Sequence, residues 1–153
     1  MLYLLVLGVV VCDQLSKYLI EQLLEPNQTF PIIKGLFHLT LVHNTGAAFG
    51  IFRHQTFLLI LISGISILII IHNLVTTRTP WCSKQSIALY LILGGAIGNL
   101  IDRVRLGYVV DFIDLRIWPV FNFADTAITL GVILLCYIVF KESITTKRKT
   151  GAC

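Results

Sequence analysis

Four long runs of apolar residues dominate the chain. They cover about residues 2–24, 57–75, 87–103 and 126–140, and the last two are the shortest. An α-helix of about 17 to 25 apolar residues is long enough to cross a bilayer. The pattern therefore predicts an all-α membrane protein with four transmembrane helices, in which residues 1–153 form a single polytopic domain.

The connection between the first two runs has a different pattern. Residues 36–42, Leu-Phe-His-Leu-Thr-Leu-Val, alternate in polarity and include β-branched side chains, which predicts a strand. The small residues of 44–50, including Gly46, would allow the close backbone approach of a turn or re-entrant segment that lines a cavity. We therefore expect a small β-like extracytoplasmic region between the first and second helices.

Composition and charge set the orientation of these helices. The chain is 56% hydrophobic and 13% charged, which is typical of a polytopic membrane protein. Most of the net charge of +4 reflects a basic C-terminal tail, which favours a cytoplasmic anchor over nucleic-acid binding. An even number of helices puts both termini on one side. The basic residues then expected in the cytoplasm are Lys141, Lys147, Arg148, Lys149, Arg78 and Lys84, against Lys34, Arg53, Arg103, Arg105 and Arg116 outside. The margin is only one residue, but the dense tail favours cytoplasmic termini.

Cysteine and histidine residues do not suggest a metal site. The cysteines are single and scattered, without CxxC spacing: Cys12, Cys82, Cys136 and Cys153. The histidines lack the HExxH spacing of a zinc site: His38, His43, His54 and His72. We therefore expect no disulfide framework, no bound metal and no cofactor.

Two charged residues interrupt the first apolar run. Asp13 and Lys17 are four residues apart and so share one helix face, which should point into the bundle as a charged pair. One alternative function is a small proton-coupled transporter that uses Asp13, Lys17 and Asp102 as a relay. A transporter needs polar groups at both ends of its path. The inner halves of the other three runs are almost entirely apolar.

Polar residues gather where the third run ends and the fourth begins. They are Asn99, Asp102, Arg103, Asp111, Asn122 and Asp125. Two carboxylates about 4 Å apart repel by about 4 kcal/mol at an effective dielectric constant of 20, so only one would ionise near neutral pH. Such a pair can act as acid and base, as in aspartic proteases. Spacing alone does not separate this pair from a structural ion-pair network.

Five motifs in order resemble those of bacterial lipoprotein signal peptidase, signal peptidase II. They are DQLSK at 13–17, NTGAAF at 44–49, GGAIGNLIDR at 94–103, VVDF at 109–112 and FNFAD at 121–125. The resemblance implies an aspartic endopeptidase of the bacterial inner membrane. Such an enzyme removes signal peptides from diacylglyceryl-modified prolipoproteins and cuts on the N-terminal side of the lipidated cysteine.

The same resemblance implies a role for each motif residue. Asp111 and Asp125 would be catalytic, and Asp13 and Lys17 a structural charged pair. Supporting and substrate-binding positions would be Asn44, Gly46, Asn99, Asp102, Arg103 and Asn122. Asp102 would be salt-bridged to a basic residue such as Arg103. The implied partners are prolipoproteins, membrane lipids and a cyclic peptide inhibitor such as globomycin, which would meet the active site toward the outer leaflet.

Overall fold

The part of the chain that the structure describes forms four long helices and one small sheet. The computed structural model describes residues 3–46, 52, 55–76 and 83–150. Its elements are α1 (Tyr3–Leu23), β1 (Thr29–Ile33), β2 (Phe37–Asn44), α2 (Thr56–Thr76), α3 (Lys84–Leu106), β3 (Val109–Asp114) and α4 (Phe123–Thr150). Each helix is long and apolar enough to cross a membrane, which confirms the predicted class of fold. The predicted turn or re-entrant segment over 44–50 lies outside the described residues beyond Gly46.

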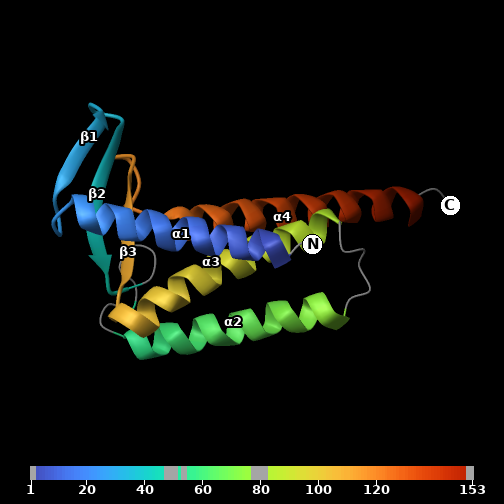
Figure 1. Ribbon diagram of the computed structural model, residues 1–153. Helices are drawn as coiled ribbons and strands as arrows, with labels where there is room; N and C mark the ends of the chain where they lie inside the picture. The colour runs from blue at the N-terminus through green and yellow to red at the C-terminus, as the bar shows by residue number, and fades with distance from the viewer. Residues whose placement is uncertain (1–2, 47–51, 53–54, 77–82, 151–153) are drawn as a thin grey trace.

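Helix α3 lies at the centre of the bundle and contacts the other three helices. Figure 1 shows α1, α3 and α4 running along one another, with the sheet across one end of them. Glycines let α3 and α4 approach closely: a Cβ on Gly95 would lie 2.4 Å from the carbonyl oxygen of Ala124, and one on Gly131 would lie 2.7 Å from that of Ala88. This contact brings the first turn of α4 directly against α3.

The sheet is antiparallel, in the order β1-β2-β3. The edge strand β1 tolerates Pro31, because a proline cannot donate to a ladder and is confined to edges and bulges. The third strand comes from the connection between α3 and α4 and was not predicted. Its short sequence, Val-Val-Asp-Phe-Ile-Asp, contains two acidic residues, and aspartate is depleted in strands.

The sheet is fastened to the bundle by an apolar cluster of Ile20, Leu41, Val110 and Phe112. In the β2–β3 ladder Val42 pairs with Asp111 and Asn44 with Val109. The register therefore brings the end of β2, with Asn44, next to Asp111. The ladder aligns two motifs that are far apart in the sequence.

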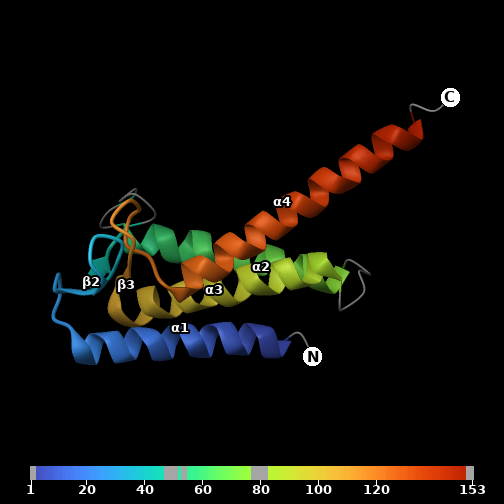
Figure 2. The same ribbon diagram turned by 90° about the horizontal axis from the view of Figure 1, so that it is seen from above.

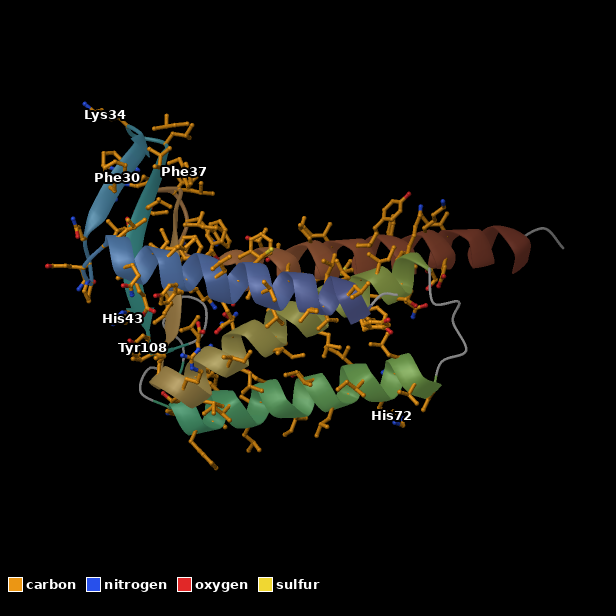
Figure 3. All side chains as sticks on the ribbon, viewed as in Figure 1. Phe30, Lys34, Phe37, His43, His72 and Tyr108 are labelled. Carbon is orange, nitrogen blue, oxygen red and sulfur yellow. The ribbon has the colours of Figure 1, made fainter. Side chains whose placement is uncertain are left out.

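The sheet lies at one end of the molecule, and the start of α1 and the end of α4 lie toward the other. The first turn of α1 and the last turn of α4 both lie away from the sheet, and α4 diverges from the other helices along its length (Figure 2). Figure 3 shows Phe30 and Lys34 on the hairpin at the sheet end, whereas His72 lies toward the far end of α2. His43 stacks on Tyr108 with ring centroids 4.1 Å apart.

Candidate active site

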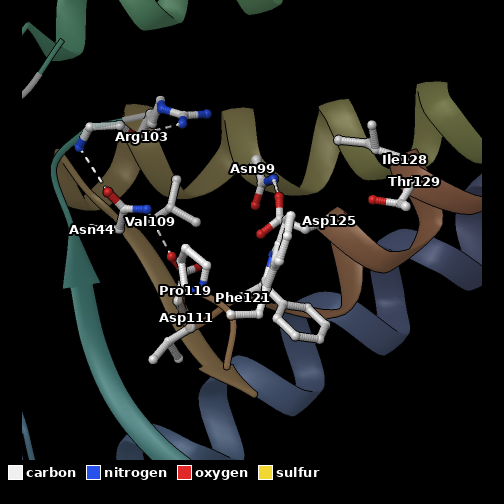
Figure 4. Close-up of a pocket in the computed structure, with 13 residues that line it drawn as sticks. Asn44, Asn99, Arg103, Val109, Asp111, Pro119, Phe121, Asp125, Ile128 and Thr129 are labelled. Carbon is white, nitrogen blue, oxygen red and sulfur yellow. Dashed lines mark hydrogen bonds between the residues drawn. The ribbon is translucent and has the colours of Figure 1, made fainter. Parts of the chain in front are cut away.

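A cavity of about 240 Å³ lies where the sheet meets α3 and α4. Its polar lining contains six of the predicted site residues: Asn44, Gly46, Asn99, Arg103, Asp111 and Asp125. Figure 4 shows the two carboxylic acids at this cavity, one from β3 and one from the first turn of α4. The other wall is mostly apolar: Val109, Trp118, Pro119, Val120, Phe121, Ile128 and Thr129.

Asp111 is held by two amide groups. Asn44 Nδ2 donates to its Oδ2 at 2.9 Å, and Asn122 Nδ2 donates to its Oδ1 at 2.7 Å. The residue is 2% exposed. Burial, and next the charge of Asp125, raise the pKa of Asp111 to about 7, although the two amide donors act in the opposite direction. Asp111 can therefore keep its proton up to neutral pH.

Asp125 is placed by the start of α4. Its Oδ2 accepts the backbone N–H of Asn122 at 3.3 Å, while Asn122 Oδ1 accepts the backbone N–H of Asp125 at 2.8 Å. This reciprocal pair has the form of a capping box, with Asn122 as N-cap and Asp125 at the third helical position. The spacing Asn-x-x-Asp is a local sequence signal from which this N-terminus could have been found. Asn99 Nδ2 donates to the other oxygen, Oδ1, at 2.8 Å.

Asn122 lies behind the cavity, where it is completely buried. Its Nδ2 contacts Asn99 Oδ1 at 3.0 Å and the Val110 carbonyl at 3.3 Å in addition to Asp111. Asn99 and Asn122 therefore connect the two carboxylic acids through hydrogen bonds. The Asn122 side chain does not reach the cavity, and its hydrogen bonds hold Asn99 and Asp111 in place.

A buried ionic cluster lies deeper in the bundle. Lys17 Nζ is 2.8 Å from Asp13 Oδ2 and 2.7 Å from Asp102 Oδ2, and each of the three side chains is less than 5% exposed. The ion-pair partner of Asp102 is thus Lys17 on α1, and not its neighbour Arg103, because adjacent residues of a helix do not face each other. The three candidates for a transport relay are thus paired with one another as ions.

Asp102 has two further hydrogen-bond partners. Gln14 Nε2 donates to its Oδ1 at 2.8 Å, and the backbone N–H of Val110 donates to its Oδ2 at 3.2 Å. Gln14 was not among the predicted site residues, although it follows Asp13 within the first motif. Asp102, on α3, is therefore bonded to both α1 and β3, deeper in the bundle than the cavity.

Arg103 places a cation at the cavity. Its Nη2 donates to the carbonyl oxygen of Gly46 at 3.3 Å, and the Gly46 N–H donates to Asn44 Oδ1 at 2.9 Å. Figure 4 shows Arg103 and Asn44 on the same side of the cavity. The Arg103 guanidinium and the Asn44 amide thus lie beside the two carboxylic acids.

Comparison with known proteins gives consistent similarities over nearly the whole chain. The family model for signal peptidase (SPase) II matches residues 5–141. A lipoprotein signal peptidase of Moorella thermoacetica is 52% identical over 136 residues, covering 88% of this chain and 89% of the relative. One of Halothermothrix orenii is 44% identical over 144 residues, covering 93% and 97%. A solved bacterial membrane enzyme structure, determined by the in meso method at 2.3 Å, has a TM-score of 0.87 and 33% identity, covering 93% of this chain and 88% of the other.

Proposed function

Since the chain belongs to the signal peptidase II family of lipoprotein signal peptidases, we propose that Asp111 and Asp125 are the catalytic pair with which it cleaves prolipoproteins. One observation carries the proposal. Two carboxylic acids line the same cavity, each is held by an asparagine amide, and the pKa of Asp111 is raised to about 7. A pair that shares one proton at neutral pH suits an aspartic endopeptidase.

The reaction uses Asp125 as base and Asp111 as acid. Asp125 takes a proton from water as the water oxygen attacks the scissile carbonyl carbon, and Asp111 gives its proton to the carbonyl oxygen. The tetrahedral intermediate collapses, the C–N bond breaks, and the cysteine nitrogen leaves with the proton held by Asp125. Asp111 recovers its proton from the intermediate's hydroxyl. The products are the signal peptide and a lipoprotein with the lipidated cysteine at its N-terminus.

The walls of the cavity suit a lipid-linked peptide. Arg103 and Asn44 can hold the peptide backbone, whereas an adjoining apolar cavity of about 320 Å³ shares Trp118, Phe121 and Asp125 with the site. We assign this apolar side to the lipid-bearing end of the substrate and to membrane lipids. A cyclic peptide inhibitor such as globomycin would compete for the same cavity.

The catalytic pair should give the enzyme a characteristic pH dependence. Because the folded-state pKa of Asp111 is raised to about 7, the acid is present below that pH and lost above it. We expect kcat/KM, which reports the pKa of the free enzyme, to fall about tenfold per pH unit above about pH 7. The measurement is kcat/KM from about pH 5 to pH 9 with a lipidated prolipoprotein.

Asp114→Asn is the matched control for the pH profile. Asp114 lies on the same strand as Asp111, but its carboxylate pairs with Arg116 at 3.1 Å and does not line the cavity. The control should leave the descending limb in place. A native kcat/KM that stays constant up to about pH 9 would contradict the assignment of the acid.

We place the enzyme in the bacterial cytoplasmic membrane, with both termini in the cytoplasm and the active site toward the outer leaflet. Two observations support this orientation. The basic tail after Phe140 favours the cytoplasmic side. The sheet lies at the opposite end of the bundle from the last turn of α4 (Figure 1), and residues of β2 and β3 line the cavity.

Single-cysteine labelling tests the orientation. In a variant without the native cysteines, Lys34→Cys in the exposed hairpin should react with a membrane-impermeant maleimide on intact spheroplasts, since Lys34 lies at the sheet end. Ser143→Cys, exposed near the other end of α4, should react only after the membrane is opened. The opposite pattern would invert the topology.

A further inference from the structure

The ammonium group of Lys17 uses all three of its donors on buried partners. Besides Asp13 and Asp102, its Nζ donates to Asn99 Oδ1 at 3.1 Å, and the residue is 2% exposed. An ammonium group has donors and no acceptor. Only the oxygen of the Asn99 amide can therefore face Lys17.

This constraint decides where the amide nitrogen of Asn99 points. With Oδ1 turned to Lys17, Nδ2 is directed at Asp125 Oδ1, to which it donates at 2.8 Å. A flipped amide would set two donors against each other at Lys17 and turn an acceptor toward Asp125. Lys17 thus selects the one orientation of Asn99 in which Asp125 receives a hydrogen bond.

The constraint continues through the second asparagine. Asn99 Oδ1 also accepts from Asn122 Nδ2 at 3.0 Å, so that nitrogen faces Asn99 and can at the same time donate to Asp111 Oδ1 at 2.7 Å. Asn122 Oδ1 then accepts the backbone N–H of Asp125. Lys17 therefore orients the amide N–H of Asn99 that Asp125 accepts and, through Asn99, the amide N–H of Asn122 that Asp111 accepts.

We propose that Lys17 is a positioning residue for catalysis, which acts through Asn99 and Asn122 to orient the hydrogen bonds on Asp125 and Asp111. Lys17 does not line the cavity and so does not touch the substrate. The proposal rests on the proposed catalytic pair. It differs from a purely structural charged pair, because it ties Lys17 to the reaction rate as well as to stability.

Removal of Lys17 alone would not test this role. It would leave Asp13 and Asp102 buried without their cation, and an uncompensated buried charge strongly destabilises a protein. Asp13→Asn/Lys17→Met removes one carboxylate together with the ammonium, so the cluster keeps its native net charge. Asp102 would retain its hydrogen bonds from Gln14 and from the Val110 N–H. The matched control is Asp13→Asn, whose single amide oxygen can accept from Lys17 Nζ and so keep Lys17 beside Asn99, although the bond from the Ala124 N–H is lost.

The readout is kcat and KM on a lipidated prolipoprotein, with folded protein verified by thermal denaturation. We expect Asp13→Asn to keep kcat near native, and Asp13→Asn/Lys17→Met to lower kcat by about tenfold to a hundredfold, with KM changed by less than about threefold. A purely structural role predicts equal kcat per folded molecule in both variants. A kcat for the double variant within about twofold of its control would overturn the proposal.

A second variant keeps the test decisive if methionine prevents folding. Asp13→Asn/Lys17→Gln offers the polar pocket an amide, which can both donate and accept and therefore satisfies either orientation of Asn99. Its kcat should also lie at least about tenfold below that of Asp13→Asn, and equality within about twofold would overturn the proposal.

Asp111→Asn and Asp125→Asn belong in the same assay. If both are inactive while the Lys17 variants match their control, the catalytic pair stands and the positioning role is wrong. If Asp111→Asn turns over normally, the catalytic pair itself is wrong.

Discussion

Asp111→Asn and Asp125→Asn are each expected to reduce prolipoprotein cleavage by about 10³-fold or more. An asparagine at 125 cannot take a proton from water, and one at 111 cannot supply the proton that a carboxylic acid gives to the carbonyl oxygen; general acid–base catalysis contributes about 10² to 10⁴ in rate. The two groups act as a unit, so the double variant should cost little more than either single variant. Mass measurement of the released signal peptide gives the rate.

The same variants should fold. Asp111 accepts a hydrogen bond from Asn44 Nδ2 and one from Asn122 Nδ2. An asparagine at 111 has only one side-chain oxygen, so one of these two donors loses its acceptor, which costs about 1 to 3 kcal/mol. Asp114→Asn, on the same strand but outside the cavity, is the control and should cleave at a near-native rate. Near-normal turnover by Asp111→Asn at a normal protein level would refute the assignment.

Lipidation of the substrate is expected to change the cleavage rate by about 10² or more in the same bilayer. The proposed catalytic pair lines the cavity where the sheet meets α3 and α4, beside an apolar cavity lined in part by Leu115, Trp118 and Leu130. Each buried methylene contributes about 0.8 kcal/mol of membrane partitioning, so two acyl chains fix the depth of the cysteine. An unlipidated prolipoprotein could still enter by its signal helix, but its scissile bond would not be held in register, and misplacement by about 1 Å can cost about 10² in rate.

The test compares one prolipoprotein with and without its diacylglyceryl group, in nanodiscs of one lipid composition. kcat and KM are measured for both, and Asp111→Asn gives the background. Equal turnover of the two substrates would show that the lipid does not position the scissile bond. Discrimination that appears only in KM would mean that the lipid contributes binding and not alignment.

Local patterns in the sequence determined the four helices. A run of apolar residues long enough to cross a bilayer predicts a transmembrane helix from its own composition, whatever its neighbours in the fold are. All four runs accordingly correspond to helices. The helices extend beyond some runs, most of all α4, which reaches Thr150 through a polar end that hydropathy does not detect. The strand predicted over 36–42 corresponds to β2, Phe37–Asn44, for the same local reason.

Only the tertiary structure decided which polar groups meet. Lys17 and Asn99 are 82 residues apart, and Asn44 and Asp111 are 67 apart, so neither contact is present in any local pattern. The third strand forms because β2 offers it a partner and Val110 and Phe112 enter the core. The sequence identified which carboxylic acids are costly to bury, since the membrane penalises every charge in an apolar run. It could not determine that Lys17 compensates Asp102, or that two asparagines connect this ion pair to the proposed catalytic acids, because the packing of the helices and the pairing of β3 with β2 set those distances.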